Sequence, residues 1–125
     1  ITAPRGSLRV VDQLTAVKAR DRLTINVELS NEGRECWKED PARPVRLAYR
    51  WQQVGSHTIT EGERTALPFG GVPGGRTICA AMDIFSPEQA GDYRLTVTLV
   101  QEAVGWFDTM GDGFQAHIFA VSVIA

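Results

Sequence analysis

The sequence predicts an all-β protein, an immunoglobulin-like or jelly-roll antiparallel sandwich of two sheets with about seven or eight strands. Apolar residues alternate with a period of two along most of the chain, and no segment carries the apolar stripe of a helix. Turns rich in Gly and Pro separate the alternating segments at short intervals. Asp92-Tyr93, just before a late strand, fits a tyrosine corner, in which a buried Tyr hydroxyl bonds back to the backbone.

The alternating segments define the expected strands in chain order. These strands are residues 7–11, 22–30, 45–54, 57–60, 76–85, 93–101 and 114–124. Trp51, on an interior-patterned strand, is the expected core tryptophan. Residues 67–75 and 105–113 are expected loops, and Pro73-Gly74 is the expected central pair of a type II turn, because Pro fixes φ and Gly tolerates a positive φ.

Length and charge restrict the class of protein. The 125 residues fit a single domain, 1–125, with a real core, and 43% of them are hydrophobic. A net charge of -2 gives no electrostatic footprint for nucleic acid or an anionic membrane. No apolar run approaches the ~20 residues that span a bilayer. Because the chain starts at Ile1 and shows no signal peptide, we expect a domain cut from a longer protein.

Metal and cofactor sites are not expected. His57 and His117 lie far apart and are not spaced with Cys or carboxylates as zinc ligands are. The loop from Asp108 to Gly113 has aspartates near glycines, but it lacks the further acids of an EF-hand and is expected to be a solvated turn. For the two cysteines, Cys36 and Cys79, free thiols are favoured over a disulfide.

No catalytic residues are expected, and the chain is not expected to be an enzyme. The sequence lacks a Gly-x-Ser-x-Gly elbow. Asp83 and Glu102 are the acids that can be proposed as a glycosidase pair, but a sandwich of this size offers no obvious cleft between them. The Gly-rich segment 70–75 has no Lys-Ser/Thr and no following helix, so it is expected to be a turn and not a phosphate loop.

Aromatic residues outside the expected core are the candidates for ligand binding. Trp106 and Phe107 follow the end of a strand, and Trp37 lies in a charged loop. Exposed rings beside polar groups suit sugars, because the ring stacks on C–H groups while polar neighbours bond hydroxyls. The candidate glycan-binding residues are Gln101, Glu102, Trp106, Phe107, Asp108 and Trp37. The alternative, that these rings plug the ends of the sandwich or pack on another domain, stays open.

The sequence also resembles a family of accessory sandwich domains. The resemblance rests on Pro44–Trp51, on Gly62–Pro68 with the Pro-Gly turn after it, on Gly91–Leu95, and on Leu99–Glu102 with Trp106-Phe107. It is to the immunoglobulin-like domains at the ends of bacterial surface-polysaccharide proteins, among them glycosyltransferases, methyltransferases and the ATP-binding subunits of O-antigen ABC exporters. In the exporter subunits this domain recognises the finished O-polysaccharide end and selects cargo.

The resemblance implies a cytoplasmic, non-catalytic domain that binds a polysaccharide glycan for export at the inner membrane. Its other partner is the chain's own missing N-terminal domain, an ATPase or a glycosyltransferase. The exporter-type sandwich can dimerise by exchanging its last strand, which 114–125 would allow here, although an ordinary edge strand is the simpler interpretation. The second hypothesis is a structural domain that positions a glycosyltransferase or mediates oligomerisation. Under the first, Trp106→Ala is expected to abolish glycan binding and to leave the melting temperature nearly unchanged.

Overall fold

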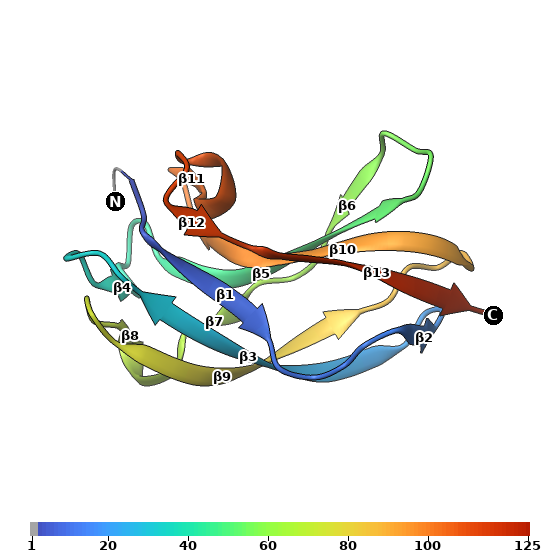
Figure 1. Ribbon diagram of the computed structural model, residues 1–125, viewed down its shortest axis with the longest axis horizontal. Helices are drawn as coiled ribbons and strands as arrows, with labels where there is room; N and C mark the ends of the chain where they lie inside the picture. The colour runs from blue at the N-terminus through green and yellow to red at the C-terminus, as the bar shows by residue number, and fades with distance from the viewer. Residues whose placement is uncertain (1–2) are drawn as a thin grey trace.

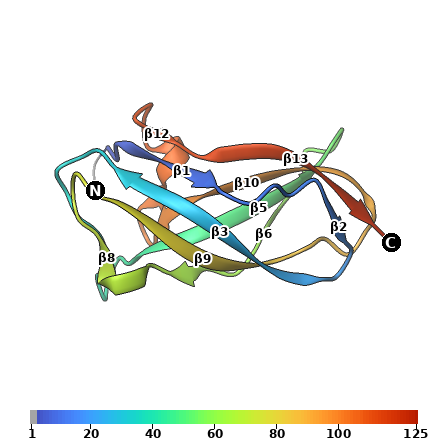
Figure 2. The same cartoon turned by 60° about the horizontal axis from the view of Figure 1, so that its bottom comes forward.

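The computed structural model describes residues 3–125 and has an all-β fold of two packed sheets. Figure 1 shows the two layers one above the other. The smaller sheet has four strands in the order β12-β1-β3-β9, and the larger has seven, with the path β2-β13-β10-β5-β6 and with β11 and β7 paired to β10 and β5. In Figure 2, β3 and β9 cross in front of β5 and β10. This is the predicted immunoglobulin-like sandwich.

The strands follow the predicted segments closely, with short strands added in the loops. The smaller sheet contains β1 (Gly6–Val10), β3 (Arg22–Asn31), β9 (Thr77–Phe85) and β12 (Phe114–Gln115). The larger contains β2 (Ala16–Lys18), β5 (Val45–Gln53), β6 (Ile59–Glu61), β7 (Thr65–Ala66), β10 (Gly91–Gln101), β11 (Gly105–Trp106) and β13 (His117–Ile124). A two-stranded ribbon joins β4 (Trp37–Lys38) to β8 (Gly71–Val72), and the 3-10 turns are η1 (Pro68–Gly70) and η2 (Phe107–Thr109).

The core lies between the inner faces of the two sheets. Alternate residues of β3 face it, and so do alternate residues of β5 and β10. Because neighbours in a strand point to opposite faces, one side of each strand supplies the core. The inward residues of the three strands include Ile25, Val27, Leu29, Leu47, Tyr49, Trp51, Leu95, Val97 and Leu99, all of them buried. Trp51 is therefore a core tryptophan, as predicted.

The tyrosine corner is present. Tyr93 is buried, and its hydroxyl donates to the carbonyl oxygen of Gln89, at 2.9 Å. This bond ties the turn before β10 to the strand itself, as the Asp92-Tyr93 pattern predicts. The ring of Tyr93 also packs edge to face on Trp51, with centroids 5.9 Å apart.

Two local predictions differ from the structure. The turn in the Gly-rich segment has Gly74-Gly75 as its central pair, because Arg76 N–H donates to Pro73 O and the positive φ, +79°, falls on Gly75. The predicted central pair, Pro73-Gly74, therefore lies one residue before the observed pair. The sandwich is also not wholly antiparallel, since β1 pairs with β12, and β2 with β13, in parallel. Two strands that are not joined by a hairpin can pair in either direction, parallel or antiparallel.

Cys36 and Cys79 are both exposed, and they are not bonded to each other. In residues 3–125 no helix is both long enough and apolar enough to cross a bilayer.

Candidate functional site

Trp106 lies on the outer face of the larger sheet, between two arginines. It is opposite Val100 in the pairing of β10 with β11, so both side chains project on the same face. The guanidinium carbons of Arg50 and Arg64 lie 4.7 Å and 4.8 Å from the centroid of its ring. These are cation–π distances, and each contact contributes on the order of 0.5–2 kcal/mol, depending on solvation. We call Arg50, Arg64, Glu102, Trp106 and Asp108 the tryptophan–arginine cluster.

Carboxylates complete the cluster. Asp108 forms an ion pair with Arg50 in which both side chains are less than one-fifth exposed. Glu102 accepts from Arg64 Nε at 3.0 Å, and Glu61 lies 3.2 Å from Arg64 Nη2. Burial alone lowers the pKa of Arg64, but the hydrogen bonds to Glu102 and Glu61 outweigh it and the pKa is raised. Both arginines are therefore paired with carboxylates and stacked on the Trp106 ring.

The tryptophan–arginine cluster covers the outer face of the larger sheet. Ala48 and Thr98 pair across β5 and β10 and face outward, yet both are fully buried. The Thr98 hydroxyl also bonds to Asp108, at 3.4 Å. The predicted residues Glu102, Trp106 and Asp108 are thus brought together, but the two carboxylates are already paired with Arg64 and Arg50. The geometry favours a structural role for Trp106.

Trp37 and Phe107 are not exposed rings, and the prediction for both is wrong. They are 1% and 0% exposed, and with Phe114 they form a cluster of edge-to-face rings with centroids 5.4–5.7 Å apart. Trp106 has an extended backbone and Phe107 begins η2, so the two rings point to opposite sides and Phe107 enters the core. Trp37 reaches the core because β4 pairs with β8 across the end of the sandwich.

Gln101 is buried at the end of β10, and its amide nitrogen donates to the carbonyl oxygen of Arg43, at 3.3 Å. It fastens the loop before β5 and is not positioned to meet a ligand. Of the predicted site residues, Gln101, Trp37 and Phe107 are therefore in the interior, and the other three belong to the tryptophan–arginine cluster.

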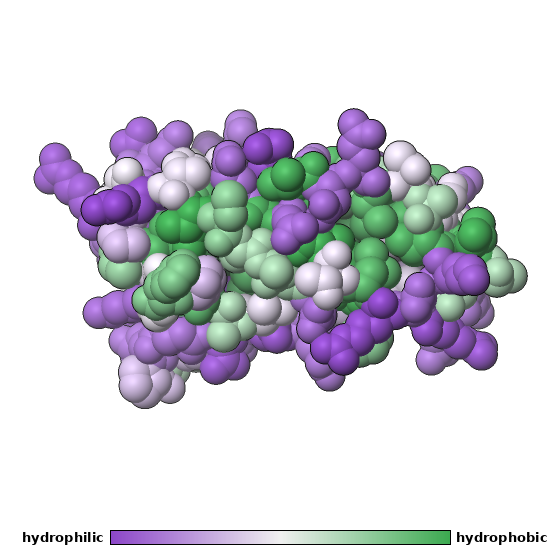
Figure 3. Space-filling model, turned by 90° about the horizontal axis from the view of Figure 1, so that it is seen from below, coloured by the Kyte–Doolittle hydropathy of each residue, from purple (hydrophilic) through white to green (hydrophobic). Residues whose placement is uncertain are grey.

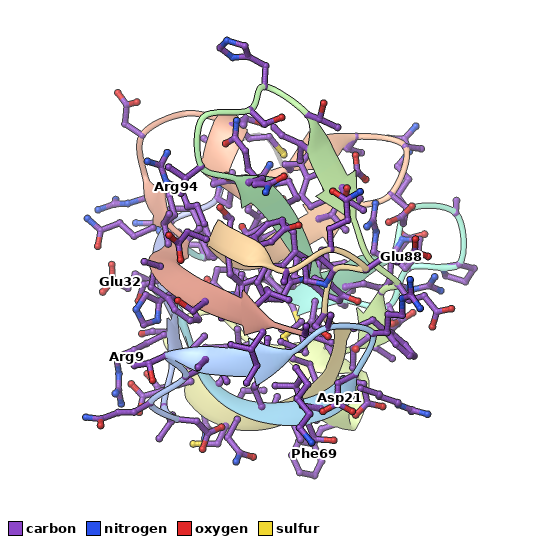
Figure 4. The ribbon with its side chains drawn as sticks, turned by 90° about the vertical axis from the view of Figure 1, so that its right-hand side faces the viewer. Arg9, Asp21, Glu32, Phe69, Glu88 and Arg94 are labelled. Atoms are coloured by element: carbon purple, nitrogen blue, oxygen red, sulfur yellow. The ribbon has the colours of Figure 1, made fainter. Side chains whose placement is uncertain are left out.

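A cleft of about 570 Å³ opens on the other side of the larger sheet, between the two layers. One wall is the hairpin of β5 and β6, and the other is the segment Phe85–Gln89 that leads from β9 towards β10. The buried rings of Tyr49, Trp51 and Tyr93 form its floor. Figure 4 labels Glu88 on the second wall and shows Phe69 far from it, at the bottom of the molecule. The volume falls within the range of ordinary small-molecule sites.

The floor of the cleft is held rigid by hydrogen bonds to the end of β9. The Tyr49 hydroxyl accepts from Phe85 N–H, and Trp51 Nε1 donates to Phe85 O, both at 2.9 Å. Burial raises the pKa of Tyr49, although its hydrogen bond to Phe85 opposes the shift. Gly62 lies directly on the same ring, where an added Cβ would sit 1.9 Å from Tyr49 Cζ. The rings therefore cannot move without displacing both walls.

The rim of the cleft carries polar side chains that have no hydrogen-bond partner within the described part of the chain. These are Gln53, Thr58, Thr60, Glu88 and Gln89. They supply hydroxyl, amide and carboxylate groups, which both donate and accept. The contrast with the tryptophan–arginine cluster is direct. There the polar groups are paired with one another, whereas here they face solvent beside an aromatic floor.

Little in the sequence points to this cleft. Its residues come from three separate stretches, 49–62, 85–89 and Tyr93, and only the pairing of β5 with β10 and the approach of β9 join them. The alternation of β5 did predict that Tyr49 and Trp51 face inward, but not that the layers part beside them. Within residues 3–125, no group of three or more His, Cys, Asp or Glu side chains is arranged to hold a metal ion.

No protein-family model matches this sequence, and no curated protein is significantly similar to it. Solved structures do share its fold. A β-glucosidase from Listeria innocua superposes with a TM-score of 0.61 at 13% identity, covering 98% of this chain and 16% of the enzyme's chain. The CARDB domain of PF1109 from Pyrococcus furiosus, solved in complex with di-metal ions, superposes with a TM-score of 0.53 at 15% identity, covering 99% of this chain and 96% of that domain.

At these identities the similarity concerns the fold alone. The chain spans about one-sixth of the length of the β-glucosidase and almost all of the CARDB domain. Both matches agree with an immunoglobulin-like sandwich.

Proposed function

We propose that this chain is a non-catalytic carbohydrate-binding domain and that it binds glycan in the cleft between β5–β6 and Phe85–Gln89. One observation carries the proposal. Polar side chains without partners in the chain surround an aromatic floor that is fixed by hydrogen bonds. A sugar presents hydroxyls to donors and acceptors and C–H groups to apolar surface, so it can use both parts of this cleft.

The chemistry of the rim suits a neutral or weakly charged polyhydroxylated ligand. Amides of Gln53 and Gln89 and hydroxyls of Thr58 and Thr60 each supply a donor and an acceptor. Glu88 adds an acceptor for a pair of sugar hydroxyls. In keeping with the resemblance stated above, the proposed ligand class is the O-polysaccharide of the bacterial surface, and the proposed role is selection of cargo for export.

Binding without cleavage is also part of the proposal. Glycoside hydrolysis uses two carboxyl groups on either side of the bond that breaks. The carboxylates at this cleft are Glu61 and Glu88, and Glu61 is already held by Arg64. With Glu61 held by Arg64, these two carboxylates do not form a free pair on either side of a bound sugar.

Calorimetric titration of the chain with O-polysaccharide oligosaccharides and with hexose disaccharides such as laminaribiose tests this proposal. We expect saturable binding of at least one glycan. Gln89→Ala should weaken it roughly 3- to 10-fold, the usual effect of losing one hydrogen bond. Gln115→Ala, the same change at an exposed residue of β12 outside the cleft, should leave affinity unchanged. Binding that Gln89→Ala does not weaken would place the glycan elsewhere.

A second function is favoured by the extent of the match to the β-glucosidase. There the same fold makes up 16% of a longer chain. We therefore keep, as the alternative, a structural domain that positions a neighbouring glycosyltransferase or mediates oligomerisation. If no glycan in the panel produces heat, the carbohydrate proposal fails and this alternative stands.

A further inference from the structure

The free edge of β9 lies outside the tryptophan–arginine cluster, and only its last residue, Phe85, lines the cleft. β9 has nine residues and ends the order of strands in the smaller sheet, and no other described strand pairs with its outer edge. The other strands at the ends of the sheets are short: β2 and β6 have three residues each and β12 has two. A long unpaired edge presents a row of backbone donors and acceptors to another strand.

The hydrogen bonds at Phe85 show which residues present these groups. Tyr49 and Trp51 bond to the N–H and C=O of Phe85, so its backbone groups point away from β3. In an antiparallel ladder alternate residues point the same way. The backbone groups of Thr77, Cys79, Ala81 and Asp83 therefore also point to the outer edge. Side chains of β5 occupy the edge only at Phe85.

The partial exposure of core-facing side chains in β9 indicates that nothing in the described chain covers this edge. Met82 and Ile84 face the core and are buried, whereas Ile78 and Ala80 face the same way and remain partly exposed. The chain that carries β7, η1 and β8 passes this side of the molecule without pairing with β9. Figure 3 shows an apolar band along the lower face of the molecule, between polar side chains.

β9 also lacks the features that usually protect an edge strand. Its sequence, TICAAMDIF, contains no Pro, Lys or Arg. Its one charged residue, Asp83, accepts hydrogen bonds from Arg22, at 2.6 Å, and from Thr24, at 2.7 Å. The Arg22 hydrogen bond lowers the pKa of Asp83, so its charge is matched within the same chain.

We propose that β9 pairs antiparallel with β9 of a second copy of this chain, about a two-fold axis at Ala81. In that register Ala81 lies opposite its own copy, and Cys79 lies opposite Asp83 of the second copy. All of these residues have outward backbone groups, so each pair exchanges both of its backbone hydrogen bonds. The contact is isologous, as two-fold dimers require.

Charge and size favour a second copy as the occupant. The register keeps the two Asp83 carboxylates apart, and each retains its own Arg22. Like charges directly opposite one another would destabilise the pair. The side chains at the centre are methyl groups, so the two smaller sheets join into one continuous sheet without a bulky residue at the axis. The pairs nearest the axis, at residues 79–83, lie outside the cleft lining, which β9 reaches only at Phe85.

Sedimentation equilibrium from low micromolar to millimolar concentration tests the proposal. We expect a reversible dimer. Ala81→Lys, which puts a charge at the axis and keeps the bonds to β3, should weaken it roughly 100-fold, as should Ala81→Pro, which removes an outward N–H. Asn26→Lys is the matched control, since Asn26 pairs with Ala81 within the sheet but lies on an inner strand. If the protein stays monomeric over the whole concentration range, the proposal is overturned. This holds even if an unrelated peptide is found to pair with the edge of β9.

A cross-link tests the register. In a Cys36→Ser, Cys79→Ser background, Ala81→Cys should form an intermolecular disulfide on mild oxidation, because hydrogen-bonded antiparallel pairs have Cα atoms ~5.5 Å apart, within disulfide range. Asn26→Cys in the same background should not cross-link. Equal cross-linking of both variants, or a dimer that survives Ala81→Lys, would contradict the pairing at Ala81.

Discussion

Trp106 and Phe107 show how one step along the chain changes the role of an aromatic residue. Trp106 lies on the outer face between Arg50 and Arg64, whereas Phe107 is in the core beside Trp37. The alternation of an extended segment already implied opposite directions for the two rings. An interpretation of the two adjacent rings as one exposed surface is therefore wrong for Phe107. Trp106, although on the outer face, packs against Arg50 and Arg64 of the same chain.

We expect Trp106→Ala to destabilise the protein and to leave glycan affinity unchanged. The change removes ring burial and two cation–π contacts and leaves two paired arginines without their packing surface, at a cost of about 1–3 kcal/mol. Urea unfolding measures the loss. This differs from the sequence-based expectation of lost binding at an unchanged melting temperature.

Trp106→Phe is the control, because it keeps a ring and should recover part of the stability. If a folded Trp106→Ala protein loses affinity for glycan, the binding site would have to be assigned to the tryptophan–arginine cluster instead of the cleft.

At the scale of elements, the loop between β3 and β5 explains why Trp37 is buried. Asn31 is 1% exposed, and its amide donates to Glu35 O at 2.8 Å and to Val72 O at 2.9 Å. Its side-chain oxygen accepts from Gly33 N–H at 3.0 Å. One side chain thus holds both the loop before β4 and the strand β8 that pairs with it. The charged neighbours of Trp37 make this segment look like an exposed loop in the sequence, although Glu39 is half-buried and pairs with Arg46.

Asn31→Ala should therefore cost about 2–4 kcal/mol of unfolding free energy, since it leaves several buried backbone groups without partners. Asn26→Ala is the matched control, because Asn26 is exposed on the same strand, and its effect should stay within ~0.5 kcal/mol. Chemical denaturation of the two variants makes the comparison. Equal losses would mean that Asn31 does not hold this loop.

The strands with regular alternation were predictable, and the contacts between separate segments were not. The expected strand 22–30 became β3 with one more residue, and the expected strand 93–101 became β10 with two more. Both have an unbroken period of two. The cleft, by contrast, depends on Phe85–Gln89 lying beside the hairpin of β5 and β6. No local pattern encodes that approach. Gly62 is a local feature related to the cleft, because the absence of a side chain there permits close packing on Tyr49.

At the scale of the whole molecule, His117 links the two sheets. Its Nδ1 accepts from Val10 N–H at 2.8 Å, which joins β13 of the larger sheet to β1 of the smaller. Burial, with a smaller contribution from Arg9, lowers the pKa of His117 below its ordinary value. The unfolded chain therefore binds a proton more readily than the folded one. Neutral His117 stabilises the fold, and this stability is lost as pH falls below about 6.5.

Unfolding free energy measured between pH 7.5 and pH 5.5 should therefore decrease as pH falls, over a range where carboxylates still carry their charge. His117→Gln should flatten this dependence, because the neutral amide does not titrate. His57→Gln, at an exposed residue, serves as the control and should keep the slope of the unchanged protein. A slope that survives His117→Gln would assign the pH dependence to other groups.

The central claim is that glycan binds in the cleft and not at Trp106, and the indole N–H signals of the three tryptophans test it most directly. Trp51 lies at the cleft, Trp37 in the core and Trp106 on the outer face. In a two-dimensional ¹H–¹⁵N NMR titration with a glycan that binds by calorimetry, we expect shifts at the Trp51 indole and at the amides of Thr58, Thr60 and Gln89. Shifts centred on the Trp106 indole, with the cleft signals unmoved, would contradict the account.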